Sequence, residues 1–155
     1  MMIETGTYRG VTAARCARLF EKVYTIELDK DLAAGATEYL RGCTNVEVIQ
    51  GDALIELSKI LARTEVHDLL VFLDGHFSGG ETAMGDLAEP AVEEIKALGA
   101  FRDKVRAVVV DDFRSFGTEK GWPSKSSLIQ SFERHLGDMD LIVHMDQVIA
   151  TSTRR

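Results

Sequence analysis

Short apolar runs alternate with amphipathic stretches along the whole chain. Several runs are almost unbroken, which is typical of strands buried on both faces of a parallel sheet. The stretches between them repeat apolar residues every three to four positions, which predicts helices. Strands that alternate with helices indicate an α/β fold with a doubly wound, mostly parallel sheet. The predicted strands are Met1–Ile3, Val23–Leu28, Val46–Ile49, Leu69–Leu73, Val105–Val110, Leu141–Val143 and Val148–Thr151.

Five helices are expected between these strands, and the end of the chain follows another pattern. Leu141–Val143 and Val148–Thr151 are separated only by residues 144–147, which predicts a closing antiparallel hairpin. Pro90 is expected in the first turn of the fourth helix, where its missing N–H costs little. The helices are indicated by the spacings Ala13/Cys16/Phe20, Leu32/Ala36/Leu40 and Ala53/Leu57/Leu61 and by the ranges Ala88–Leu98 and Ser124–Leu136.

Length and charge narrow the range of functions. A chain of 155 residues accommodates one domain, residues 1–155. Its formal charge of −7 makes nucleic acid an unfavourable partner. No apolar run approaches the roughly 18 residues of a membrane span, and the start lacks a signal-peptide pattern. The two isolated cysteines, Cys16 and Cys43, are typical of the reducing cytoplasm. We therefore expect a cytoplasmic protein with a small-molecule ligand and no membrane partner.

Ligands of such folds bind outside the carboxyl ends of the strands, so candidate binding residues are those that directly follow each apolar run. Gly6, within residues 4–10, permits a sharp turn before a helix whose N–H groups face a ligand. Glu27 follows Gly6 by 21 positions, which is the placement of an acid that binds ribose hydroxyls. Asp29 is suited to cap the next helix. Asp52 can cap a helix or accept a hydrogen bond from an adenine amino group.

Three further acids follow the fourth and fifth strands. Asp74 ends one run, and Asp111 and Asp112 end the next. Adjacent strands lie about 4.8 Å apart, so these carboxylates can converge and need a divalent cation, a basic side chain or a proton to neutralise them. Mg²⁺ prefers such oxygen ligands; pairing with Arg114 or Lys120 is the alternative. His76 lies beside these acids and is a candidate proton acceptor.

The ordered set Glu4-x-Gly6-x-x-x-Gly10, Glu27, Asp52 and Asp74 resembles class I S-adenosylmethionine-dependent methyltransferases. The stretches 4–10, 73–80 and 110–112 are more narrowly similar to the macrocin O-methyltransferase group, whose site resembles that of catechol O-methyltransferases. The resemblance implies a Rossmann-like sheet in the order 3-2-1-4-5-7-6. It also implies Mg²⁺-assisted methyl transfer to a hydroxyl group of a sugar or a catechol-like diol.

The resemblance also implies roles for individual residues. Glu27 would bind the ribose hydroxyls of S-adenosylmethionine, and His76 would act as the base beside the catalytic Asp74. Phe77 stands where catechol enzymes have their lysine base. The methionine part would lie against Glu4, Thr5, Gly6, Thr7 and Tyr8, the adenine against Asp52 and Ala53, and Mg²⁺ against Asp74, Asp111 and Asp112.

One departure from the family leaves other functions open. Relatives carry helices before the first strand, whereas this chain begins at that strand. We expect this cover to be missing, to come from another subunit, or to be lost through a misplaced start; an uncovered sheet end favours a homo-oligomer. A non-catalytic cofactor-binding module is one alternative. A nicotinamide-dependent oxidoreductase is another, although G-x-G-x-x-G is absent.

Overall fold

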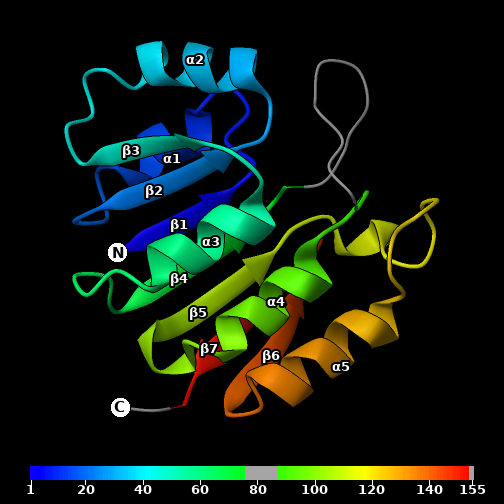
Figure 1. The fold of residues 1–155 in the computed structure, drawn as a ribbon. Helices are drawn as coiled ribbons and strands as arrows, with labels where there is room; N and C mark the ends of the chain where they lie inside the picture. Colours follow the sequence, from blue (N-terminus) through cyan, green and yellow to red (C-terminus); the bar gives the residue numbers. More distant parts are fainter. Residues whose placement is uncertain (76–86, 154–155) are drawn as a thin grey trace.

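A seven-stranded sheet in the order β3-β2-β1-β4-β5-β7-β6 forms the centre of the molecule. This arrangement comes from a computed structural model, which describes residues 1–75 and 87–153. The first five strands are parallel, and β7 pairs antiparallel with both β5 and β6 (Figure 1). The predicted Rossmann-like fold, strand order and closing hairpin are therefore confirmed. The strands are β1 (Met2–Thr5), β2 (Val23–Glu27), β3 (Val46–Gln50), β4 (Leu69–Leu73), β5 (Val105–Val110), β6 (Met139–His144) and β7 (Gln147–Ser152).

Helices cover both faces of the sheet (Figure 1). The larger core lies under α3, α4 and α5 and contains Ile3, Leu57 and Ile95. The smaller core includes Met2, Ala13 and Ala36 and lies under α1 and α2. Neighbouring residues of β1 thus enter opposite cores, as the alternation of side chains along a strand requires. The helices are α1 (Val11–Cys16), α2 (Lys30–Tyr39), α3 (Ala53–Leu61), α4 (Ala91–Gly99) and α5 (Lys125–His135), with short 3₁₀ turns at η1 (Arg102–Lys104) and η2 (Phe113–Ser115).

Two predicted helix details are wrong. The first helix ends at Cys16 and does not reach Phe20, because the Asn45 amide binds the carbonyl oxygens of Ala17 and Phe20 at 2.8 and 2.9 Å. The fourth helix begins at Ala91 and not at Ala88. Pro90 is its N-cap, and its carbonyl oxygen accepts from the Glu94 N–H at 3.0 Å, so Pro90 belongs to the first turn as predicted. Both changes affect only helix ends.

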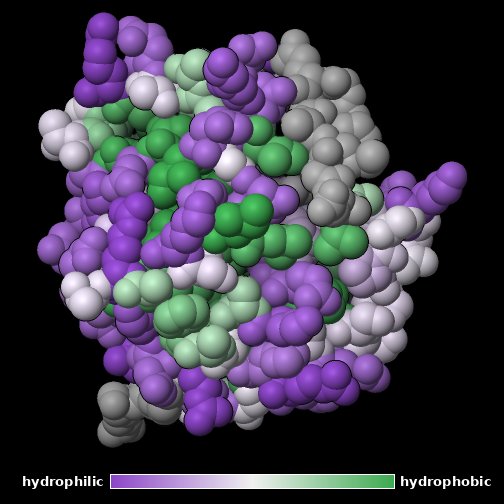
Figure 2. Space-filling view, viewed as in Figure 1, coloured by the Kyte–Doolittle hydropathy of each residue, from purple (hydrophilic) through white to green (hydrophobic). Residues whose placement is uncertain are grey.

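The outer surface is mixed in character. Apolar side chains gather around α3 on the face shown in Figure 2, whereas α5 presents mostly polar groups. Within α3, Ile55 is 55% exposed. No helix within residues 1–75 or 87–153 combines the length and apolar character that a membrane crossing needs. Cys16 and Cys43 are free thiols, and both are half-buried.

Candidate functional site

The glycine turn after β1 lies directly against the end of β4. Gly6 has φ +86°, which L side chains rarely adopt. A Cβ on Gly6 would overlap the carbonyl oxygen of Asp74 and lie 2.8 Å from its carbonyl carbon. The backbone N–H of Asp74 in turn donates to the Thr5 carbonyl at 3.1 Å. The fold therefore brings the predicted methionine-binding turn and Asp74 together.

Glu27 is fixed beside the same turn by two backbone hydrogen bonds. Its Oε2 accepts from the Tyr8 N–H at 2.8 Å, and its Oε1 accepts from the Asp29 N–H at 2.9 Å. Tyr8 adopts a positive φ of 49°, which directs its N–H to the carboxylate. Each carboxylate oxygen keeps further acceptor capacity, so Glu27 can still bind hydroxyl groups. The structure thus fits the ribose-binding role that the sequence predicts for Glu27.

Glu4 is buried under the turn in a chain of hydroxyl groups. The Thr25 hydroxyl donates to its Oε2 at 2.5 Å, and the Thr7 and Thr25 hydroxyl oxygens are 2.7 Å apart. Burial raises the pKa of Glu4 to about 7; the Thr25 hydrogen bond opposes this shift, and the charges of Asp74 and Glu27 add to it. A positively charged ligand beside these acids would favour their ionised forms. This arrangement suits the sulfonium and ammonium groups of S-adenosylmethionine.

Asp29 and Asp52 both act as helix caps. Asp29 Oδ1 accepts from the N–H groups of Asp31 and Leu32 at 2.8 and 2.9 Å. Asp52 Oδ1 accepts from the Leu54 N–H at 2.8 Å. The capping alternative for Asp52 is thus confirmed, and its contact with adenine, together with that of Ala53 at the start of α3, stays a prediction. His76 lies outside the described residues, so its predicted role as a base also stays a prediction.

The three acids predicted to bind metal lie near one another but do not form a metal site in the described part of the chain. Burial, followed by the charges of Asp111 and Asp112, raises the pKa of Asp74 to about 7. Asp112 Oδ1, however, pairs with Arg114 Nη2 at 2.9 Å, and Asp111 Oδ1 accepts from the Asp112 backbone N–H at 2.9 Å. Within residues 1–75 and 87–153, no three acidic, histidine or cysteine side chains are placed to hold a metal ion. These residues, as arranged, do not fit Mg²⁺.

Two further buried acids, Glu89 and Glu94, lie at the start of α4, and the sequence analysis did not identify them. Glu89 lies just before the N-cap residue Pro90, and its Oε1 accepts from the N–H of Ala91, the first residue of α4, at 2.8 Å. Burial raises its pKa to about 7; the bond to Ala91 opposes this, and the charges of Asp74 and Asp112 add to it. Glu94 is fully buried in α4. The sequence does contain a sign of Glu94. It is an acid at helical spacing from Ala91 and Leu98, so it lies on the apolar face of α4.

The Glu94 carboxyl group and the Thr5 hydroxyl are buried next to each other, too far or too poorly aligned for a full hydrogen bond. Neither oxygen of the Glu94 carboxyl group nor the Thr5 hydroxyl finds a hydrogen-bond partner among the described residues. Burial raises the pKa of Glu94 to about 8; the charges of Glu89 and Asp52 add to this, and the nearby Thr5 hydroxyl opposes it. Glu94 is therefore expected to be protonated near neutral pH, since a buried carboxylate without partners is costly.

A separate hollow of about 360 Å³ lies between the start of α1 and the length of α2. Tyr8 is its one lining residue that the sequence analysis assigned to the cofactor. The hollow does not include Glu27, Asp52 or any of the predicted metal acids. Its lining residues are Tyr8, Arg9, Val11, Asp31, Leu32, Gly35, Ala36 and Tyr39.

Known methyltransferases share this architecture. A proposed O-methyltransferase from Klebsiella pneumoniae superposes with a TM-score of 0.66 at 16% sequence identity, over 99% of this chain and 73% of that chain. An SAH-bound methyltransferase from Podospora anserina gives a TM-score of 0.66 at 14% identity, over 99% of this chain and 71% of that chain. The fold is that of the Rossmann-like methyltransferases. SAH is S-adenosylhomocysteine, the product that S-adenosylmethionine leaves after methyl transfer.

A curated protein matches part of the chain. The ribosomal RNA small subunit methyltransferase A of Pelotomaculum thermopropionicum is 41% identical over 54 residues, which are 35% of this chain. The match spans only 18% of that protein. No protein-family model matches the chain. The methyltransferase fold is therefore established, and the narrower macrocin-like assignment stays a prediction.

Proposed function

We propose that this chain is an S-adenosylmethionine-dependent methyltransferase that methylates a hydroxyl group of a small molecule, such as a sugar or a catechol-like diol. The main support is that the Gly6 turn, Glu27 and Asp74 lie together at the carboxyl ends of β1, β2 and β4, in a methyltransferase fold. The SAH-bound structural neighbour supports the choice of cofactor. A cytoplasmic location and a small-molecule partner remain part of the proposal.

The chain's own residues would bind and align the reactants. Glu27 would hold the ribose hydroxyls, and the Gly6–Tyr8 turn would hold the methionine part next to Asp74. S-adenosylmethionine would supply the methyl group on a positively charged sulfur. Glu4 and Asp74 would stabilise that charge, and His76 is the proposed acceptor of the hydroxyl proton. Alignment of the two reactants would supply most of the rate enhancement. No step is assigned to Mg²⁺, because Arg114 holds Asp112.

Transfer of a radiolabelled methyl group tests this function. The purified chain is incubated with S-adenosylmethionine and separate pools of sugars, catechols and ribosomal RNA. Labelled sugar or catechol supports the proposal, and labelled RNA alone would overturn the choice of acceptor. Binding of S-adenosylhomocysteine without transfer to any pool would favour the cofactor-binding module. Binding of NAD in place of S-adenosylhomocysteine would favour the oxidoreductase.

Glu27→Gln is expected to weaken the binding of S-adenosylhomocysteine by roughly 10- to 100-fold. The substitution removes the charge that strengthens hydrogen bonds from the ribose hydroxyls, and such bonds contribute about 1.5–3 kcal/mol. Isothermal titration calorimetry measures the change. Glu38→Gln is the matched control, because Glu38 is 70% exposed on α2 and pairs with Arg41. Equal affinities in the two variants would remove Glu27 from the cofactor site.

A further inference from the structure

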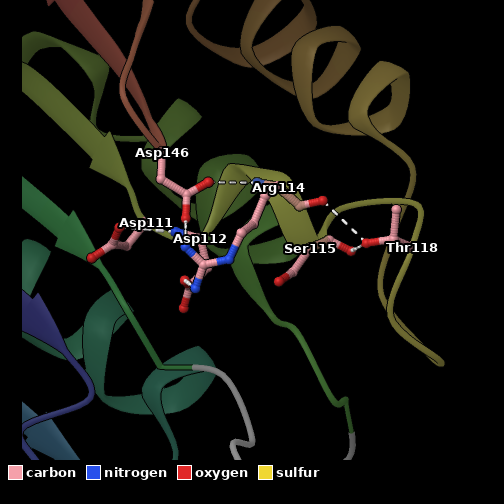
Figure 3. A network of polar contacts seen from close by, with 6 residues as sticks. All are labelled: Asp111, Asp112, Arg114, Ser115, Thr118 and Asp146. Carbon is pink, nitrogen blue, oxygen red and sulfur yellow. Dashed lines mark hydrogen bonds and ion pairs between the residues drawn. The ribbon is translucent and has the colours of Figure 1, made fainter.

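Arg114 lies among acidic side chains just after β5 (Figure 3). Its Nη2 is 2.9 Å from Asp112 Oδ1, and its Nη1 binds Asp146 Oδ2. Asp146 comes from the turn between β6 and β7, so the guanidinium joins two segments that are distant in sequence. The positive charge of Arg114 therefore occupies the edge where the sequence predicts a metal ion.

The backbone around Arg114 fixes this placement. Asp146 Oδ1 accepts from the Arg114 backbone N–H at 2.7 Å, and the Asp146 carbonyl accepts from the Phe113 N–H at 2.8 Å. The Arg114 carbonyl accepts from Lys125 Nζ at 2.9 Å and from the Thr118 hydroxyl at 3.1 Å. An exposed ion pair alone contributes little to stability, and the Arg114 side chain is 73% exposed. The additional backbone contacts keep Arg114 next to Asp112.

Asp111 and Asp112 already bind groups of the protein, which disfavours binding of a metal ion. Asp112 has a left-handed backbone with φ 51°, and its N–H binds the Asp111 side chain. An octahedral Mg²⁺ site needs several oxygens at about 2.1 Å from one point. The guanidinium already contacts Asp112 and would repel a second cation nearby.

We propose that Arg114 replaces the divalent cation at the carboxyl edge of this sheet. Its guanidinium neutralises Asp112, so the three aspartates do not assemble into a metal site. Methyl transfer by this chain then proceeds without a metal ion. The catalytic consequence rests on the proposed function, whereas the consequence for metal binding does not.

Titration with Mn²⁺ tests the replacement directly, because Mn²⁺ accepts the same oxygen ligands as Mg²⁺. Arg114→Gln is expected to bind Mn²⁺ roughly tenfold more tightly than the wild-type chain, since it removes a cation from beside Asp112. Arg106→Gln is the control and should leave Mn²⁺ affinity unchanged. Arg106 forms a similar exposed ion pair with Asp68 at 2.7 Å, at the opposite end of the strands. Wild-type affinity in Arg114→Gln, with its thermal unfolding midpoint preserved, would overturn the proposal.

A chelation experiment separates this proposal from the proposed function. Wild-type methyl transfer is expected to be unchanged by excess EDTA. Transfer that EDTA abolishes and Mg²⁺ restores would overturn the replacement while leaving the methyltransferase intact. Absence of transfer in every condition would contradict the proposed function, and the Mn²⁺ titration would still decide the role of Arg114.

Discussion

Gly6→Ala is expected to abolish binding of S-adenosylhomocysteine and to lower the free energy of unfolding by about 2–4 kcal/mol. A Cβ at this position would overlap the Asp74 carbonyl oxygen, and the φ of +86° is itself unfavourable for alanine. The turn can relieve the overlap only by moving away from the end of β4. That movement would separate the two halves of the proposed cofactor site. Calorimetric titration and urea unfolding measure the two effects.

Gly35→Ala provides the matched control for this substitution. Gly35 lies in α2, and a Cβ there would meet no atom within 4 Å. Alanine is favoured over glycine inside a helix by about 0.5–1 kcal/mol, so this variant should be slightly more stable than the wild-type chain. Retained affinity for S-adenosylhomocysteine in Gly6→Ala would show that the close approach of the turn to Asp74 is not needed for binding.

Glu94→Gln is expected to raise the free energy of unfolding by roughly 2–4 kcal/mol at pH 8 and above, and by less than about 1 kcal/mol at pH 5. Glu94 is fully buried, and its carboxyl oxygens have no hydrogen-bond partner among the described residues. Its pKa rises from 4.5 to about 8 in the folded chain. The folded state thus binds more protons than the unfolded state between these values, and stability falls as pH rises through that window.

Urea unfolding at several pH values between 5 and 8.5 measures this effect as the difference between the variant and the wild-type chain. Glu93→Gln is the control, because the Glu93 side chain is 45% exposed and pairs with Lys96 at 2.9 Å. It should change stability little at any of these pH values. A difference between Glu94→Gln and the wild-type chain that does not grow with pH would mean that Glu94 is not a buried, protonated acid.

The strands of the sheet could be predicted from the sequence because each strand is marked by its own run of apolar residues. Unbroken apolar runs such as Leu69–Leu73 belong to strands covered on both faces, and the sequence pattern records this directly. The first helix was predicted too long because Asn45, 25 residues beyond Phe20 along the chain, binds the carbonyl group of Phe20. A contact at that separation leaves no trace in the spacing of residues 13–20.

The candidate site was predictable only where it depends on chain order. Gly6, Glu27 and Asp74 each follow a strand, and neighbouring parallel strands bring their ends together. Pairing of Asp112 with Arg114 was one of the two alternatives that the sequence left open, and the structure contains that pair. The second partner of Arg114 could not be foreseen, because Asp146 lies 32 positions away in a hairpin turn. Glu89 and Glu94 were missed because helix α4 was interpreted from its apolar positions alone. An acid within the apolar face of a predicted helix therefore indicates a buried ionisable group.

A crystal structure of the chain with S-adenosylhomocysteine tests the central claim most directly. We predict that the ligand lies between the Gly6 turn and Asp74, with both ribose hydroxyls about 2.7 Å from the Glu27 carboxylate. Crystals grown at saturating ligand that lack it there would contradict the claim. Ligand bound only in the hollow between α1 and α2, without contact to Glu27, would contradict it equally.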